Sequence, residues 1–555
     1  MSDNAYRKAI DIKTFCFRIG TKIHCERVML QNLPLGSSDF STLRANNEIY
    51  VDKTLLVYQL ARQRGKIFLA RPRRFGKSLL ISTFESLFKN GLRDFQGLAI
   101  EKLWRDKTYP VVRLDFSELK EFLTIEEFKR TFHNFLALNF KSVGFNYDPT
   151  GIDDTIFQLS AWFKTLAPSS LVILIDEYDA PLTACLDKPE VFKEVRTILG
   201  RLFLTLKSNE GCQRFFFMTG ITKFSNTSIF SAFNNMQDIS LDADYGTLLG
   251  YTEEEIRHYF AGYLSKAADV LSISEGQLID QLRKNYNGFC FDEEASTSVY
   301  CPWSVLNFLN RPKKGFQNYW YTSGGQPTVL MKYLSKHALS QPISYSENKV
   351  VRLSDLNASR QYDEIRLDVL LTQAGYLTIR SVMPNEYVVL GYPNQEVSLS
   401  IAQLYSDELL KGKLLEQAHD TAISNIMAKG STEEVIDSFN RAVAAIDYQH
   451  YPIVNEVSCR AYLQVLLIGA AMMPQVEVHN ALGRSDMEVH AGNRHWVFEF
   501  KYAKDDHEAD SLLEEAQNQI RTRQYGCKQP NEELLRVALV FSGEKRRFVA
   551  WRQIP

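Results

Sequence analysis

The sequence of 555 residues lacks the features that define several common protein classes. Its 8 cysteines form no CxxC pair, so neither a zinc ribbon nor a disulfide framework is predicted, and we expect free, buried or partly buried thiols. An excess of basic charge is also missing, because 64 Lys and Arg residues face 66 Asp and Glu residues and the formal net charge is −2. Any surface that binds nucleic acid must therefore be a local patch.

Long apolar runs are absent as well. The longest, such as residues 465–473, fall far short of the roughly 20 residues that a membrane-spanning helix needs. The first residues are polar and charged with no apolar segment behind them, so a signal peptide is not expected. The composition thus predicts a cytoplasmic protein without membrane association, and its length requires several domains.

The first half of the chain alternates between short apolar segments and longer amphipathic ones. Residues 171–175 are apolar on both faces, as a central parallel strand requires when helices cover both sides of its sheet. The pattern therefore predicts an α/β fold with a doubly wound parallel sheet. Beyond residue 251 it becomes mostly helical, starting with a capping box at Thr252 and Glu255. The predicted strands are 67–70, 111–115, 171–176 and 215–219, and the predicted helices between them are 77–89, 125–140, 155–166 and 191–206.

A phosphate-binding loop is predicted between the first of these strands and the helix after it. The loop sequence RPRRFGKS is a Walker A motif in which Arg71 replaces the first glycine. Backbone N–H groups and the helix dipole attract phosphates there, while Lys77 would reach the terminal phosphates and Ser78 would hold Mg²⁺. The alternative is a helix start with exposed basic residues. The residues predicted to bind ATP are Arg73, Arg74, Phe75, Gly76, Lys77 and Ser78.

A second motif, about a hundred residues further on, favours nucleotide binding over that alternative. The apolar strand at 171–176 ends in Asp176 and Glu177, a Walker B arrangement. Asp176 would hold the Mg²⁺ shell, and Glu177 would polarise the water that attacks ATP. Thr219 and Thr222 follow another strand, where a polar side chain could sense the γ-phosphate; hydroxyls that cap a strand end are an equally good interpretation.

The C-terminal hundred residues contain a third chemical motif. A strand with Asp486 and a tight turn lead into a strand on which Glu499 and Lys501 share one face with Val497. A hairpin would bring Asp486 beside Glu499, and two facing carboxylates suit Mg²⁺ or Mn²⁺. The metal would activate water, while Lys501 would orient the nucleophile or offset negative charge. The alternative is an exposed strand with a solvated Glu and Lys pair.

Three further groups flank this motif. Glu456, on a preceding helix, is a candidate third carboxylate for the metal, although a surface role fits it equally well. His490 and His495 border the hairpin, and we interpret them as structural or solvent-facing and not as ligands. Basic side chains nearby could follow a phosphate backbone: Arg484, Arg494, Lys504, Arg521, Arg523, Lys545, Arg546 and Arg547.

The chain resembles the prokaryotic AAA-ATPase-like proteins that carry a C-terminal PD-(D/E)xK nuclease domain. In that family an arginine usually replaces the first P-loop glycine, as Arg71 does here, and Ala516 to Ile520 match the family's Ala-x-x-Gln-Ile helix. The motifs that carry the resemblance are YVDKT at 50–54, RPRRFGKSL at 71–79, DEYD at 176–179, LGYT at 249–252, YNGF at 286–289 and YCPWS at 300–304.

The resemblance implies a P-loop NTPase with a helical extension, followed by an αβββαβ restriction-endonuclease-like domain. The expected boundaries are 1–30 for an N-terminal lead-in, 31–250 for the ATPase domain, 251–340 for its helical extension, 341–445 for a connecting segment and 446–555 for the nuclease-like domain. The expected partner is nucleic acid, with DNA favoured over RNA, and a homo-oligomer is a further expectation.

Two functions follow from these motifs. The first is an ATP-regulated nuclease that uses Asp486, Glu499, Lys501 and a divalent metal ion. The second is a nucleotide-dependent switch whose C-terminal domain binds nucleic acid or a protein without cleaving it. The presence of all three C-terminal motif residues favours the nuclease.

Overall fold

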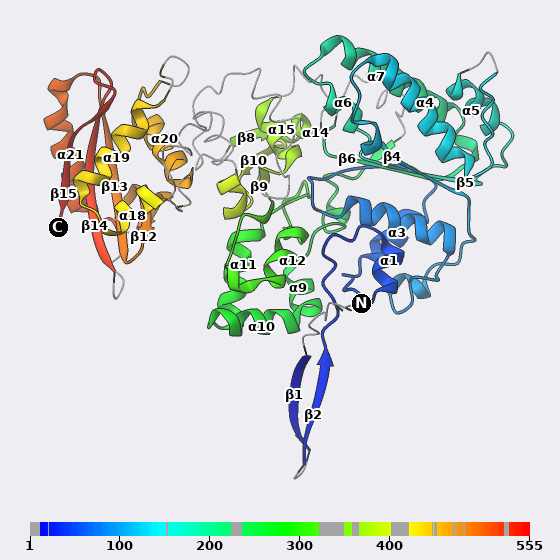
Figure 1. The fold of residues 1–555 in the computed structure, drawn as a ribbon, viewed down its shortest axis with the longest axis horizontal. Coiled ribbons are helices and arrows are strands. Elements are labelled where there is room, and N and C mark those ends of the chain that lie inside the picture. The colour runs from blue at the N-terminus through cyan, green and yellow to red at the C-terminus, as the bar shows by residue number, and fades with distance from the viewer. Residues whose placement is uncertain are drawn as a thin grey trace, which may run out of the picture. The chain divides into compact units, whose positions relative to one another are not determined.

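The computed structural model divides into two compact units, which are described separately (Figure 1). The first comprises Met1–Leu330 and Val350–Asn394, and the second comprises Met331–Lys349 and Gln395–Pro555. The residues that the structure describes are 12–19, 22–150, 154–223, 236–320, 349–357, 366–400, 421–446, 448, 452–469, 472, 474–480, 483–526 and 532–555. Among them no helix combines the length and apolar character needed to cross a bilayer.

The first unit is built on a five-stranded sheet with the order β4-β5-β6-β3-β7. All four pairings are parallel, and β5 and β6 are buried along their whole length because helices cover both faces. The strands are β3 (Lys66–Ala70), β4 (Val111–Asp115), β5 (Leu171–Asp176), β6 (Gln213–Gly220) and β7 (Met236–Asp238). The predicted doubly wound sheet is confirmed, with the short strand β7 as an addition.

Helices lie on both faces of this sheet, with α1 and α3 on one and α4, α5, α6 and α7 on the other (Figure 1). The four helices predicted between the strands are confirmed: three of their starts match, and the other ends differ by one to three residues. The helices are α1 (Phe40–Ala45), α2 (Thr54–Ala61), α3 (Lys77–Asn90), α4 (Ile125–Lys141), α5 (Thr155–Phe163), α6 (Ala180–Ala184) and α7 (Pro189–Ser208). Short 3-10 helices lie at Ala99–Lys102, Phe116–Leu119, Glu210–Cys212 and Ala243–Tyr245.

A helical region follows the sheet, as the sequence predicts. Its first helix starts with the expected capping box, in which Thr252 accepts from the N–H of Glu255 and the Glu255 side chain accepts from the N–H of Thr252. Buried side chains such as Phe260, Leu282 and Tyr286 form a core between the helices. The helices are α9 (Glu253–Tyr259), α10 (Ala261–Leu271), α11 (Glu275–Tyr286) and α12 (Pro302–Asn310), followed by a 3-10 turn at Pro312–Lys314.

Part of the segment at 341–445 packs into this first unit. A small sheet with the order β8-β10-β9 lies there, and the Cys290 N–H donates to Thr378 Oγ1 at 2.7 Å. A Cβ at Gly288 would lie 2.1 Å from the Pro393 carbonyl oxygen, so only glycine permits this approach. The elements are β8 (Lys349–Arg352), α14 (Leu353–Asn357), α15 (Leu367–Ala374), β9 (Thr378–Met383) and β10 (Tyr387–Gly391).

The N-terminal lead-in contains an antiparallel hairpin. Its strands are β1 (Ile12–Ile19) and β2 (Lys22–Met29), paired from Ile12 with Met29 to Ile19 with Lys22. Elsewhere in the described chain, five cysteines are buried: Cys185, Cys212, Cys290, Cys301 and Cys459.

The second unit is a five-stranded sheet in which strand order follows chain order, β11-β12-β13-β14-β15. β13 and β14 are parallel and joined through α21, whereas the other pairs are antiparallel. This arrangement confirms the predicted αβββαβ core. Its elements are α18 (Thr421–Lys429), α19 (Thr432–Ala444), α20 (Glu456–Gly469), β11 (Gln475–Asn480), β12 (Gly483–Ala491), β13 (Arg494–Ala503), the 3-10 helix Asp506–Glu508, α21 (Ala509–Arg523), β14 (Glu533–Ser542) and β15 (Arg547–Ile554).

Alternation along β13 determines which side chains face which helix. Val497 packs with residues of α21 such as Leu513, so Glu499 and Lys501, two and four positions on, face the α21 side. On the opposite face, Trp496 Nε1 donates to the Met427 carbonyl of α18 at 2.8 Å. In Figure 1 α21 and the pair α18 and α19 lie on opposite sides of this sheet.

Candidate functional sites

The loop between β3 and α3 has the backbone of an anion site. Gly76 adopts a left-handed conformation with φ 94° and serves as the N-cap of α3, with no side-chain cap. The first N–H groups of α3 therefore have no competing side-chain acceptor at the cap, and the helix dipole adds positive potential. Arg74 is also left-handed, with φ 71°, so two residues of this loop lie where most side chains are disfavoured.

Arg71, the residue in place of the glycine, is a structural anchor. Its side chain is buried, and Nη1 donates to the carbonyls of Ala70 at 2.9 Å and Ser240 at 2.5 Å. Nη2 donates to the Tyr245 carbonyl at 3.3 Å, and the guanidinium lies 4.3 Å from the centre of the Phe291 ring. Arg71 thus ties the loop to the segment after β7, which argues against the reading of an exposed basic helix start.

Lys77 lies inside the loop, with 6% of its surface exposed. Its Nζ donates to the carbonyls of Arg71 and Pro72, both at 3.0 Å. Burial lowers the pKa of Lys77, whereas the charges of Glu177 and Asp176 act to raise it. The two sequence motifs, a hundred residues apart in the chain, therefore share one polar region.

Asp176 is the last residue of β5, and its two carboxylate oxygens have different surroundings. Oδ1 accepts from Thr219 Oγ1 at 2.7 Å. Oδ2 is buried without a hydrogen-bond partner in the described part of the chain, and its ion pair with Arg113 Nη2 is long, at 4.0 Å. A buried carboxylate oxygen without a donor suits a cation such as Mg²⁺. Ser78, the other predicted Mg²⁺ ligand, occupies the first turn of α3.

Glu177 follows in a left-handed conformation with φ 49°. Burial raises its pKa, and the nearby charge of Lys77 partly offsets this rise. Close packing at the end of β6 fixes the backbone beside it, because a Cβ at Gly220 would lie 2.6 Å from the Tyr178 ring and 2.8 Å from Asp179 Oδ1. Only glycine fits there without displacing the segment that carries Glu177.

Thr219 and Thr222, at the strand end beside Asp176, have different surroundings. Thr219 is fully buried and donates its hydroxyl to Asp176, so its immediate partner is a carboxylate. The Thr222 backbone N–H donates to Asp179 Oδ2 at 2.8 Å. Arg113, on the neighbouring strand β4, was missed because no local pattern shows which strand lies next to β5.

The second unit brings the C-terminal motif together. The antiparallel register pairs Met487 with Phe498, so Asp486 on β12 and Glu499 on β13 are next to each other. Asp486 Oδ2 accepts from the Phe500 N–H at 2.8 Å, which holds its carboxylate against β13. Glu499 is 4% exposed, and its Oε2 is buried without a hydrogen-bond partner among the described residues.

Electrostatics at this pair also favour a cation. Burial, followed by the charge of Asp486, raises the pKa of Glu499 to about 8. Burial raises the pKa of Asp486 as well, against the opposing effects of the Phe500 N–H and the charges of Arg460 and Lys501. A divalent ion would relieve both desolvation and repulsion, so these residues fit a hard metal ion.

Lys501 lies among carboxylates. Its Nζ is 3.5 Å from Glu456 Oε1, 3.5 Å from Glu515 Oε1 and 3.9 Å from Glu499 Oε1. Burial lowers the pKa of Lys501, but these charges together raise it, so the side chain is a cation. The structure thus places Glu456 at the site, with Lys501 between it and Glu499.

Two residues here were missed from the sequence. Arg460 of α20 lies 3.4 Å from Asp486 Oδ1, and Glu515 of α21 contacts Lys501. Glu515 directly precedes the Ala516–Ile520 segment, but its orientation depends on how α21 packs on β13. Of the basic group, Arg494 is paired with Glu533 at 2.8 Å and Lys545 with Asp506. Arg484 and Arg523 influence the carboxylates directly, because the charge of Arg484 lowers the pKa of Asp486 and that of Arg523 lowers that of Glu499.

Two family models match the chain, each over a range that contains residues of one of these candidate sites. Residues 34–230 match the family model described as a predicted AAA-ATPase, and residues 461–551 match that of the PD-(D/E)XK nuclease superfamily. The chain carries an AAA-ATPase-like domain and a PD-(D/E)XK-superfamily domain. A relative from Azotobacter chroococcum mcd 1, named an uncharacterized protein in the vnfD 5′ region, is 29% identical over 488 residues, which span 85% of this chain and 89% of the relative.

The matched ranges contain most of the residues singled out above. Lys77, Asp176 and Glu177 lie in the AAA-ATPase-like match, and Asp486 and Glu499 lie in the PD-(D/E)XK match together with Lys501. Glu456 lies five residues before the second matched range, so its place at the site depends on the geometry alone.

Proposed function

We propose that this protein is a nucleotide-binding, metal-dependent nuclease that cleaves phosphodiester bonds, with DNA as the expected substrate. The observation that carries the proposal is the pair Asp486 and Glu499, held on adjacent strands with Lys501 beside it. One Glu499 oxygen is buried and has no hydrogen-bond partner among the residues that the structure describes. Two such carboxylates are costly in a folded domain unless a cation is bound.

The residues around the metal have distinct proposed roles. A bound Mg²⁺ or Mn²⁺ would supply an activated water and neutralise charge on the scissile phosphate. Asp486, oriented by the Phe500 N–H, and Glu499 would hold the ion, with Glu456 as a further carboxylate on that side. Lys501 would orient the attacking water and stabilise the extra negative charge of the transition state.

The AAA-ATPase-like domain would bind ATP. Backbone N–H groups from Arg73 to Ser78 would receive the phosphates, and Lys77 would exchange its two carbonyl acceptors for phosphate oxygens. Ser78 and Asp176 would hold Mg²⁺, and Glu177 would polarise the attacking water. Thr219 would act as a positioning residue that fixes the Asp176 carboxylate.

Architecture and location belong to the same proposal. We keep 31–250 as the ATPase domain, 251–340 as its helical extension and 446–555 as the nuclease-like domain, and add residues 350–394 to the ATPase unit because they pack with it. A cytoplasmic location and assembly into homo-oligomers complete the proposal.

The test is a cleavage assay with the full chain on end-labelled DNA and RNA, with Mg²⁺ or Mn²⁺, and with or without ATP. Lys501→Ala should lower the cleavage rate by roughly 100-fold or more and leave nucleic-acid binding within a few-fold. Lys77→Ala should remove the effect of ATP and keep the nuclease carboxylates intact. Lys429→Ala, an exposed lysine at the end of α18 and outside the proposed site, is the matched control and should cleave like wild type.

Equal cleavage by wild type and Lys501→Ala would exclude the proposed site. The alternative, a nucleotide-dependent binding switch, predicts that wild type binds nucleic acid without cutting it under every metal and nucleotide condition. It also predicts that Asp486→Ala retains this binding.

A further inference from the structure

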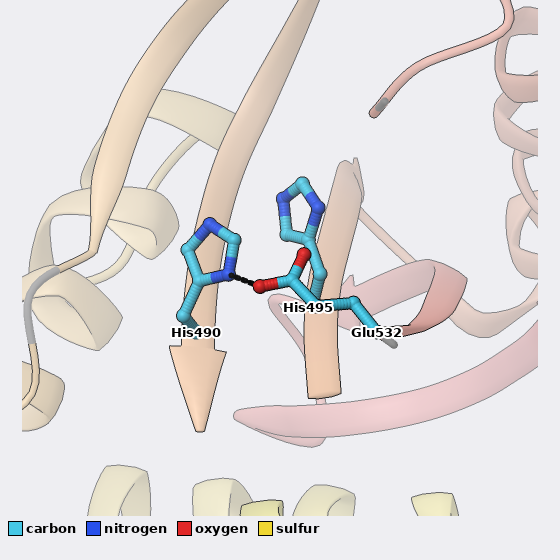
Figure 2. A group of neighbouring side chains, drawn as sticks. All are labelled: His490, His495 and Glu532. Carbon is cyan, nitrogen blue, oxygen red and sulfur yellow. Dashed lines mark ion pairs between the residues drawn. The ribbon is translucent and has the colours of Figure 1, made fainter. Parts of the chain in front are cut away.

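A second group of metal-ligating side chains lies on the same sheet, away from Asp486 and Glu499. His490 on β12 and His495 on β13 are directly paired across the antiparallel register, and Glu532 directly precedes β14. One potential ligand atom from each of the three residues lies within 4.8 Å of the other two. Since β12, β13 and β14 are consecutive in the sheet, the group joins two neighbouring strands and the residue that leads into the third (Figure 2).

His495 is prepared as a ligand by its other contact. Its Nε2 is 2.8 Å from Glu488 Oε2, and Glu488 Oε1 in turn accepts from Ser485 Oγ at 2.6 Å. An ionised carboxylate only accepts hydrogen bonds, so Nε2 carries a proton, and the neutral imidazole then has its lone pair on Nδ1. Histidines that bind metal ions usually donate their other ring N–H to a carboxylate, a backbone carbonyl or water, and this contact fixes the tautomer and the ring orientation.

The other ring nitrogen of His495, Nδ1, is available to bind a metal ion. His495 is 5% exposed, and its Nδ1 has no hydrogen-bond partner in the described part of the chain. Glu532 Oε2 is also buried without a partner there. Two such buried polar atoms in one group of side chains cost free energy that a shared cation would recover.

The third ligand is already near the required spacing. His490 Nδ1 and Glu532 Oε1 are 3.3 Å apart, and two ligands of one tetrahedral Zn²⁺ lie roughly 3.3 Å apart when each bond is about 2.0–2.1 Å. The two imidazole rings are stacked, with centroids 4.2 Å apart and an 18° angle. An ion lies in the plane of each ring that binds it, so one ring must turn. The His490 side chain, 46% exposed, has the freedom to do so.

We propose that His490, His495 and Glu532 bind one divalent transition-metal ion, with Zn²⁺ preferred, which links β12, β13 and the start of β14. Two imidazoles and one carboxylate, with water as a fourth ligand, suit Zn²⁺ and do not suit Mg²⁺, which prefers an all-oxygen shell. The ion would stabilise the end of the sheet opposite to the nuclease motif. His490 is four residues from Asp486 on the same strand, a separation of roughly 13 Å. This site does not depend on nuclease activity.

The test uses untagged full-length protein that has been stripped with a chelator and equilibrated with Zn²⁺ in excess Mg²⁺. Wild type should retain one Zn²⁺ per chain after dialysis and unfold at a higher temperature with Zn²⁺ than without. Glu488→Gln should weaken Zn²⁺ binding by roughly 10- to 100-fold, as loss of a supporting carboxylate does, and His490→Ala and Glu532→Gln by at least as much. Replacement by Co²⁺ should give visible absorption bands that shift in His490→Ala.

The controls separate this site from other places where Zn²⁺ can bind. His507→Ala changes an exposed histidine of the same unit and should bind Zn²⁺ like wild type. His490→Ala is the main variant because the His490 side chain is half exposed, so its loss should not prevent folding. His495 is buried, and the test does not require its substitution. The proposal is wrong if wild type binds no Zn²⁺ or if His490→Ala binds it equally well. An ion that survives His490→Ala and is lost in Asp486→Asn would also overturn it.

Discussion

Restoring the P-loop consensus by Arg71→Gly should destabilise the first unit. The substitution removes three hydrogen bonds from a buried cation and its contact with Phe291. The Ser240 carbonyl loses the donation from Arg71, whereas the Tyr245 carbonyl keeps the donation from the Leu248 N–H. Bonds to charged donors contribute about 1.5–3 kcal/mol each and a buried cation–π contact about 0.5–2 kcal/mol, partly offset by the cost of burying the charge. We expect a net loss of about 3–5 kcal/mol.

The matched control is the same change three residues away. Arg74 is exposed and left-handed with φ 71°, so Arg74→Gly loses a contact with Trp303 at 4.3 Å but relieves backbone strain. Its stability should change by less than about 1 kcal/mol. Urea unfolding followed by circular dichroism and fluorescence compares the midpoints. Equal midpoints for Arg71→Gly and Arg74→Gly would refute the anchor role of Arg71.

Four further predictions concern the two sites. Lys77→Ala should weaken ATP binding by roughly 10- to 100-fold, measured by titration with a fluorescent nucleotide, because a charge-assisted contact is lost. Gly220→Ala should lower the urea midpoint by an amount that corresponds to about 1–3 kcal/mol, since the added Cβ would overlap Tyr178 and Asp179. Because the pKa of Glu499 is raised to about 8, Mg²⁺ binding should tighten as pH rises from 6 to 8 and should release a proton from this carboxyl group. Calorimetry in buffers of different ionisation enthalpy measures the proton release, and Glu499→Gln should abolish it. The same raised pKa means that Glu499 makes the metal-free protein less stable as pH rises from about 4.5 to about 8, a loss that thermal unfolding with and without Mg²⁺ should show.

Local patterns were sufficient for most of the fold. The strands predicted at 111–115 and 171–176 match β4 and β5 to the residue, because a continuous apolar run between turn signals is a local property. The exposed three-residue strand β7 and the small sheet β8-β10-β9 were not predicted. Their pairing is decided by partners distant in the chain, and β7 has little apolar pattern of its own.

In the candidate sites, too, local patterns predict some residues, whereas the positions of others depend on packing between distant elements. Asp486, Glu499 and Lys501 could be placed together because hairpin register and two-residue alternation determine their positions. Arg460 and Glu515 come from helices whose rotation against the sheet no local pattern fixes. The cluster of His490, His495 and Glu532 combines residues about 40 positions apart, and the sequence alone led us to interpret both histidines as non-ligands.

The central claim is that Asp486 and Glu499 hold a catalytic metal ion. The most direct measurement is the rate of DNA cleavage as a function of Mg²⁺ concentration for wild type, Glu499→Gln and Glu514→Gln, the last an exposed glutamate of the same unit. We predict Mg²⁺-dependent cleavage by wild type and Glu514→Gln, and a rate at least roughly 100-fold lower for Glu499→Gln even at saturating Mg²⁺. Cleavage by Glu499→Gln at the wild-type rate, or wild-type cleavage that persists without a divalent ion, would contradict the account.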